Sequence, residues 1–202
     1  WFFSKNLTNV NHWNQAVLLN VVVDLDPVKL NSALNYLVKH HDALRLKFYY
    51  EGNAWHQVNT EFTDQNLLKT IDLAEFEGQN LDEVVKQHMI TAQSSFNLGE
   101  PLLIKAILFR NYRDKILLMI IAHHLVVDGV SWRILLEDLQ RVYNQLTLEK
   151  PVSFPEKTTS YKHWAEQLIN YAQSEAAFEK LAYWVEADYK GVSSLPSDYE
   201  NG

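Results

Sequence analysis

IIAHHLVVDGVSWR, residues 120–133, joins an apolar strand to an amphipathic helix through a turn that carries two histidines and an aspartate. The apolar run begins near Lys115 and is mostly aliphatic, which predicts a buried strand over residues 115–123. After Val130, apolar side chains recur with helical spacing for about five turns. These positions are Ile134, Leu135, Leu139, Val142, Tyr143 and Leu146.

Further strand and helix patterns flank this unit on both sides. Residues 102–109 predict a strand that pairs with residues 115–123 through the polar turn 110–114, and residues 44–50 and 54–59 predict a hairpin around Gly52. Residues 16–23 predict a buried strand, followed by a helix that Asp26 caps and Pro27 begins. Helices are also expected over 81–95, 161–171 and 175–189. The pattern predicts an α+β fold with a mostly antiparallel sheet and helices packed against it.

Composition limits the classes of function. The chain has 202 residues, of which 47% are hydrophobic, and its formal net charge of −7 offers no basic footprint for nucleic acid. Because the chain has no cysteine, it can form no disulfide, thiolate zinc site, iron–sulfur cluster or cysteine nucleophile. The longest apolar runs, 16–23 and 116–122, are far shorter than the ~20 residues of a membrane-spanning helix, so no membrane span is expected.

The ends of the chain predict its organisation. Trp1 is neither an initiator methionine nor the start of a signal peptide, so we interpret the chain as a piece of a longer polypeptide. Residues 191–202 have the composition of a linker. We therefore expect one lobe over residues 1–190 and the start of an interlobe linker over 191–202.

The two adjacent histidines have different expected roles. Strand alternation directs His123 and His124 to opposite faces, so only one of them can point into a given cleft. Burial and a nearby helix N-terminus would both favour a neutral imidazole, which can accept a proton. Asp128 could cap the helix, orient an imidazole or pair with Arg45. Gly129 is expected to supply a backbone angle that a side chain would forbid.

Other interpretations of the same residues remain open. A pair of histidines at a strand end can serve only packing and hydrogen bonding. A metal site at His123, His124 and Asp128 is disfavoured, because adjacent strand residues diverge, and we expect no metal. A triad of Ser131, His124 and Asp128 is disfavoured because Ser131 fits better at the start of the helix. Residues alone indicate a buried proton-transfer site without a named substrate.

The motif His123-His124-xxx-Asp128-Gly129 resembles the HHxxxDG motif of the condensation-domain superfamily of nonribosomal peptide synthetases, whose fold is similar to that of chloramphenicol acetyltransferase. Residues 40–48, HHDALRLKF, resemble a second segment of that superfamily. Residues 129–135, which include Ser131, Trp132 and Arg133, resemble the epimerization branch, as do 11–15 and 195–198. The resemblance covers essentially the whole chain, but only the N-terminal lobe of the family's two lobes.

The resemblance implies a function and residue roles. His124 would be the active-site base, His123 a structural neighbour, Asp128 a loop-ordering carboxylate paired with Arg45, and Gly129 a turn residue. Ser131, Trp132 and Arg133 would support the site. The substrate would be an aminoacyl or peptidyl thioester on the 4'-phosphopantetheine of a peptidyl carrier domain, with no cofactor bound by the chain itself, and the L residue would become D.

The same resemblance implies partners and leaves two rivals. The expected partners are a C-terminal lobe, which carries a second acid/base glutamate, and the neighbouring synthetase domains. Because that lobe is missing, the chain alone should be weak or inactive. The expected location is the cytoplasm. A condensation domain would use the same histidine to assist amine attack, whereas Trp132 and Arg133 favour epimerization by resemblance. The other rival is a carrier-docking module without catalysis.

Overall fold

The structure is a computed structural model that describes residues 1–5 and 7–186. The chain forms two compact units, Trp1–Phe154 and Pro155–Gly202, and we describe each by itself. The division lies between the helix that ends at Thr147 and the helix that begins at Tyr161. The linker predicted at 191–202 falls outside the described residues.

A four-stranded sheet in the order β1-β6-β5-β4 forms the centre of the first unit. Strands β1 (Asn14–Val21), β6 (Lys115–His123) and β5 (Ile104–Tyr112) pair antiparallel, whereas β4 (Leu68–Asp72) is parallel to β5. Most side chains of β5 and β6 are buried on both faces, as expected for central strands that are covered on both sides. The predicted α+β fold with a mostly antiparallel sheet is confirmed.

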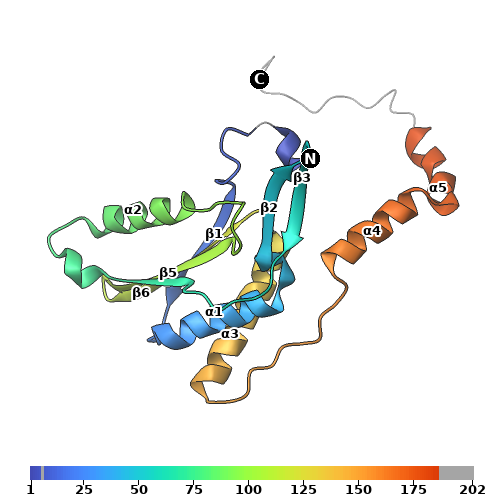
Figure 1. Cartoon of the computed structure of the whole chain (residues 1–202). Coiled ribbons are helices and arrows are strands. Elements are labelled where there is room, and N and C mark those ends of the chain that lie inside the picture. Colours follow the sequence, from blue (N-terminus) through green and yellow to red (C-terminus); the bar gives the residue numbers. More distant parts are fainter. Residues whose placement is uncertain (6, 187–202) are drawn as a thin grey trace. The chain divides into compact units, whose positions relative to one another are not determined.

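Helices cover both faces of this sheet (Figure 1). Helix α2 (Leu81–Gln93) contacts β5 and β6 on one face, and α1 (Pro27–His40) packs with α3 (Gly129–Thr147) on the other. Asp26 caps α1 as predicted, because its Oδ1 accepts the Val28 and Lys29 N–H groups at 2.8 and 3.2 Å. The predicted apolar stripe of α1 is buried: Leu30, Ala33, Leu34, Leu37 and Val38.

A separate hairpin joins β2 (Leu46–Glu51) to β3 (Ala54–Asn59), as predicted. Gly52 and Asn53 have φ of 58° and 61°, the left-handed pair that a two-residue hairpin turn requires. The Phe3 ring stacks on Trp55 with centroids 3.7 Å apart, so the N-terminal 3-10 turn η1 (Phe2–Lys5) lies against this hairpin. Two further 3-10 turns are η2 (Asp42–Arg45) and η3 (Leu73–Phe76).

Several details differ from the sequence prediction. The strand expected to be buried over 16–23 is β1, which spans Asn14–Val21 at the edge of the sheet and has no buried residue. Strand β4 was not expected, and with α2 and β5 it forms a parallel crossover within the sheet. The hairpin turn between β5 and β6 is shorter than expected, because Tyr112 already pairs with Lys115. Ile134 is 44% exposed, so the buried stripe of α3 consists of Trp132, Leu135, Leu139 and Val142 beside the polar Asp138.

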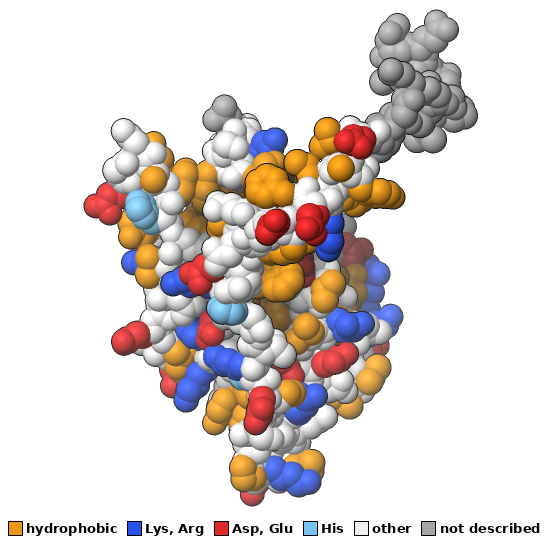
Figure 2. Space-filling model, turned by 90° about the vertical axis from the view of Figure 1, so that its right-hand side faces the viewer, with side chains coloured by type: hydrophobic (Ala, Val, Ile, Leu, Met, Phe, Trp, Pro, Cys, Tyr) orange, Lys and Arg blue, Asp and Glu red, His pale blue; other side chains and the backbone are white. Residues whose placement is uncertain are grey.

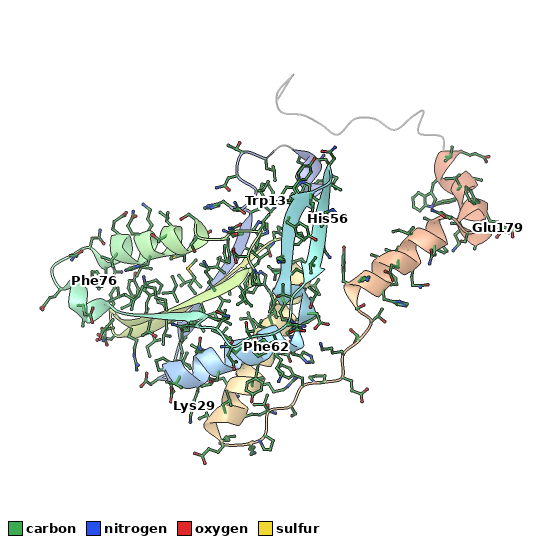
Figure 3. All side chains as sticks on the ribbon, in the orientation of Figure 1. Trp13, Lys29, His56, Phe62, Phe76 and Glu179 are labelled. Atoms are coloured by element: carbon green, nitrogen blue, oxygen red, sulfur yellow. The ribbon has the colours of Figure 1, made fainter. Side chains whose placement is uncertain are left out.

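The second unit contains α4 (Tyr161–Ala172) and α5 (Glu175–Val185), and neither helix has a buried residue. Hydrophobic side chains reach the surface in the space-filling view (Figure 2), and on these two helices they include Trp164, Leu168 and Trp184. In the first unit, by contrast, the side chains fill the space between sheet and helices (Figure 3). Among the described residues, no helix combines the length and the apolar character that crossing a membrane demands.

Candidate active site

The candidate site lies where β6 ends and α3 begins. His123, the last residue of β6, pairs with Asn14 of β1, and the His124 N–H donates to the Trp13 carbonyl at 2.8 Å. Trp13 is labelled in Figure 3 at the start of β1. Asn14 donates to the Gln93 carbonyl of α2, whereas the neighbouring Gln15 contacts α3, so the two faces of the sheet meet different helices here. The predicted divergence of the two histidines follows from this alternation.

His123 is completely buried and its two ring nitrogens are occupied by backbone groups. Nε2 donates to the Val10 carbonyl at 2.8 Å, and Nδ1 accepts the Leu125 N–H at 3.2 Å. The Phe2 ring meets the imidazole edge-on at 5.9 Å. Burial is the main cause that lowers the pKa of His123, while the bond to the Val10 carbonyl opposes this shift. Burial thus favours the neutral form of the His123 ring, which backbone groups hold at both nitrogens.

The burial of His123 predicts a pH dependence of stability. Because its folded-state pKa lies below the unfolded value of about 6.5, the unfolded chain binds the extra proton, and stability is expected to fall as the pH drops below that value. A His123→Gln variant should be less stable at neutral pH but should show a shallower loss between pH ~7 and ~5. Urea unfolding at several pH values measures this. His88, whose pKa burial also lowers, contributes the same sign in both proteins, so an unchanged slope in the variant would contradict the assignment to His123.

His124 differs from its neighbour because its side chain is exposed. Its Nδ1 lies 2.8 Å from the Val127 carbonyl oxygen, which can only accept, so Nδ1 carries the proton and donates it. Nε2 therefore presents a lone pair. The expectation that the imidazole of His124 is buried is wrong: the buried imidazole is His123, and the exposed ring of His124 is held by the Val127 carbonyl.

Asp128 and Ser131 together begin α3. The Asp128 Oδ1 accepts the Ser131 N–H at 2.8 Å and the Ser131 hydroxyl at 2.6 Å. The Ser131 hydroxyl is the main cause that lowers the pKa of Asp128, followed by the Ser131 N–H. Since the hydroxyl of Ser131 donates to Asp128, the geometry gives no Ser131–His124–Asp128 triad and assigns both residues to the helix N-terminus.

Trp132 and Gln15 complete the surroundings of His124. Trp132 is buried, and its Nε1 donates to the Gln15 Oε1 at 2.9 Å. The Gln15 Nε2 lies 3.2 Å from the His124 Nε2. Arg133 is exposed on α3. Sequence reasoning named Trp132 and Arg133 but not Gln15, which lay inside the resembling segment 11–15 and carried no chemical signal of its own.

Arg45 does not pair with Asp128, and this predicted ion pair is wrong. Its guanidinium instead binds the end of α1, because Nη1 donates to the Val38 and Lys39 carbonyls at 2.6 and 2.8 Å. Nη2 donates to the Asp42 carboxylate at 2.6 Å. Carbonyls at a helix C-terminus lack intrahelical partners, so a nearby guanidinium satisfies them.

Gly129 does not need a left-handed backbone, which corrects the expectation for this residue. It is the first residue of α3, its φ is not positive, and an added Cβ would meet nothing within 4 Å. Open space therefore lies beside the turn at this position.

Gly129→Ala is accordingly expected to fold and to be unchanged or more stable by up to about 1 kcal/mol, because alanine restricts the unfolded chain. Thermal unfolding of both chains tests this, and a clear loss of stability would contradict the geometry. If the variant is stable but slower in catalysis, the open space beside Gly129 is used by the substrate.

Three metal-ligating side chains also meet away from the motif. Donor atoms of His40, His41 and Asp138 lie within 4.8 Å of one another. Both Asp138 oxygens are already bound, Oδ2 to the His41 Nε2 at 2.9 Å and Oδ1 to the Arg141 Nη1 at 2.7 Å. A metal ion here would displace the His41 contact and lie beside a guanidinium, so the geometry favours a structural hydrogen bond between the end of α1 and α3.

Comparison with known proteins places this geometry in a family. The family profile described as Condensation domain matches residues 1–201. The chain belongs to the condensation-domain family. It corresponds to the N-terminal lobe of that superfamily, in agreement with the HHxxxDG motif at 123–129.

Curated relatives of this condensation-family chain are much longer proteins. One of the linear gramicidin synthase proteins of Brevibacillus parabrevis is 42% identical over 203 residues, which is 100% of this chain and 3% of the relative. Tyrocidine synthase 1 of the same organism is 38% identical over 208 residues, 99% of this chain and 18% of the relative. The chain thus spans less than a fifth of the length of these relatives.

Solved structures agree with the condensation-family fold. The epimerization domain from the third module of tyrocidine synthetase B is 37% identical with a TM-score of 0.87, over 99% of this chain and 45% of that one. The first condensation domain of the calcium-dependent antibiotic synthetase, in complex with a substrate analogue, has a TM-score of 0.72 at 21% identity, over 87% and 44% of the two chains. This second likeness concerns the fold alone.

The condensation-family motif does not line the hollow of about 520 Å³ on the first unit. That hollow is lined by Asn31, Ser32, Asn35, Tyr36, Lys39, Phe62, Asp64, Gln65 and Asn66. Asn31 and Asn35 are engaged there with the backbone around Gln65, which explains the cluster of amides as a joint between α1 and the segment before β4.

Proposed function

We propose that the chain is the base-carrying lobe of an epimerization domain, which converts an L-aminoacyl or peptidyl thioester into its D form in nonribosomal peptide biosynthesis. The substrate would be carried on the 4'-phosphopantetheine arm of a peptidyl carrier domain, in the cytoplasm. One observation carries the proposal: an exposed imidazole with its proton fixed on Nδ1, in a chain 37% identical to a solved epimerization domain.

The proposed step uses the Nε2 lone pair of His124. The α C–H bond breaks, the proton moves to Nε2, and the electron pair enters an enolate that the thioester carbonyl stabilises. Return of a proton on the opposite face of the planar enolate inverts the centre. The bond from Nδ1 to the Val127 carbonyl holds the ring in place and stabilises the charge that the imidazole gains.

Inversion needs a base on one face of the enolate and a proton donor on the other, and His124 supplies the base. We assign the proton donor to the C-terminal lobe that the family contributes, so residues 1–202 alone should be weak or inactive. A carrier-bound aminoacyl thioester in deuterated water tests this. Slow or absent α-deuterium incorporation is expected with the chain alone, and fast incorporation would overturn the two-lobe assignment.

Product analysis tests the function itself. The complete two-lobed domain is incubated with an L-aminoacyl carrier protein in the presence and absence of an acceptor-loaded carrier, and the released residues are separated on a chiral column. A D residue supports epimerization. A dipeptide would instead indicate condensation by the same histidine, and unchanged L residue with retained carrier binding would indicate a docking module.

A further inference from the structure

A chain of hydrogen bonds links α3 to the imidazole of His124 through β1. The Trp132 Nε1 lies 2.9 Å from the Gln15 Oε1, and the Gln15 Nε2 lies 3.2 Å from the His124 Nε2. On the far side of the ring, Nδ1 lies 2.8 Å from the Val127 carbonyl. Trp132 is buried, Gln15 is half-buried and His124 is exposed, so the chain runs from the packed interior to the surface.

The polarity of this chain follows from its two ends. An indole N–H can only donate, so the amide oxygen of Gln15 faces Trp132 and the amide NH₂ faces His124. Because that NH₂ can only donate, the His124 Nε2 must accept with its lone pair. The Val127 carbonyl independently requires the proton on Nδ1. Both ends therefore select the same tautomer.

The same polarity leaves Gln15 unable to accept a hydrogen bond from Nε2 of His124. A proton on the His124 Nε2 would face the amide NH₂ of Gln15, donor against donor. The amide cannot correct this by turning over, because its NH₂ would then face the indole N–H of Trp132. A ring that has taken a proton at Nε2 thus loses the bond to Gln15 and regains it only after giving the proton up.

We propose that Gln15 and Trp132 are positioning residues that fix the His124 tautomer and aim its Nε2 lone pair. This inference rests on the proposed function for its catalytic meaning, because Nε2 is the atom that would take the α-proton. Without substrate, the Gln15 NH₂ donates to the Nε2 lone pair, so this hydrogen bond must break when a substrate C–H group approaches.

The neighbouring histidine provides an internal reference. His123 donates from Nε2 to the Val10 carbonyl and accepts at Nδ1 from the Leu125 N–H, so it holds the opposite tautomer. None of its partners belongs to the Trp132–Gln15 chain. A change confined to His124 therefore reports on that chain and not on the fold in general.

The test is a long-range ¹H–¹⁵N spectrum of the imidazole nitrogens of the 202-residue chain at mildly alkaline pH. In the wild type we expect the proton on Nδ1 of His124 and on Nε2 of His123. Gln15→Glu replaces the donating NH₂ by an acceptor, and Trp132→Phe frees the amide to turn. In both variants the ratio of the Nε2-protonated to the Nδ1-protonated ring of His124 should rise roughly ten-fold, which is the effect of one or two hydrogen bonds. The tautomer of His123 should not change.

Asn20→Asp is the matched control, because it adds the same charge at an exposed position of β1 away from the site. It should leave both tautomers as in the wild type. An unchanged His124 spectrum in both Gln15→Glu and Trp132→Phe would overturn the inference, as would equal shifts in Asn20→Asp.

A kinetic measurement in the two-lobed domain completes the test. For Gln15→Glu we expect kcat of α-proton exchange to fall at least ten-fold with KM within about two-fold, since the ring is misprotonated while the substrate surface is intact. A tautomer shift without a fall in kcat would overturn the catalytic role. The spectrum needs no substrate, so it decides the tautomer assignment even if the wild-type domain yields no D product and the proposed function fails.

Discussion

His124→Ala in the two-lobed domain is expected to slow α-proton exchange on a carrier-bound aminoacyl thioester by about 10²- to 10⁴-fold, the usual contribution of a positioned general base. The ring is exposed and its bonds reach only Val127 and Gln15, so the variant should keep its fold and its stability to within about 0.5 kcal/mol. Tritium or deuterium exchange at the α-carbon measures the rate, and circular dichroism checks the fold.

His56→Ala serves as the control for this experiment. His56 is an exposed imidazole on β3 whose Nε2 contacts the Glu51 carbonyl within the hairpin, away from the motif. It should exchange at the wild-type rate. If His124→Ala and His56→Ala are equally active, His124 is not the base and the proposed mechanism fails, although the family assignment stands.

Asp138→Ala is expected to give the largest loss of stability among the polar substitutions considered, about 2 to 3 kcal/mol. The carboxylate side chain is 7% exposed and binds His41 at the end of α1 and Arg141 one turn along α3. Removing it leaves two donors without their acceptor at the junction between the helices, and the loss lies at or below the range for fully buried pairs because Arg141 is 41% exposed. Urea denaturation with a common slope gives the difference.

Glu137→Ala is the matched control, since it removes a carboxylate from the preceding, exposed position of the same helix. It should change stability by no more than about 0.5 kcal/mol. Equal losses in the two variants would show that helix charge, and not the junction with α1, accounts for the effect of Asp138.

Local sequence signals predicted the elements whose boundaries are set by residues within or next to them. Asp26 and Pro27 predicted the start of α1, and the apolar stripe of this helix is buried as its 3.6-residue period predicts. The Gly52-Asn53 pair predicted the β2–β3 turn. Strand β4 was not predicted, because it has five residues of which only Leu68 and Ile71 are buried. Such a pattern is too short to distinguish from a loop.

The parts of the candidate site that depend on a local motif could be predicted from the sequence, whereas contacts between residues from distant segments could not. The HHxxxDG motif located His124, and alternation separated it from His123. Arg45 was assigned a distant carboxylate although the end of α1 and Asp42 lay nearby in sequence. Gln15 meets His124 across 109 residues of chain and Trp132 across 117, and no periodicity in either segment encodes those contacts.

The acceptor for His123 has a practical consequence for domain exchange between synthetases. Val10 and Phe2 precede β1, yet they complete the pocket of the first motif histidine. A recombination junction placed at Asn14 would substitute a foreign segment there, and the fully buried His123 Nε2–H would keep a partner only if that segment placed a backbone carbonyl where Val10 has its own. Chimaeras joined upstream of Phe2 should therefore keep this packing, while those joined directly at β1 should have a less ordered turn after β6.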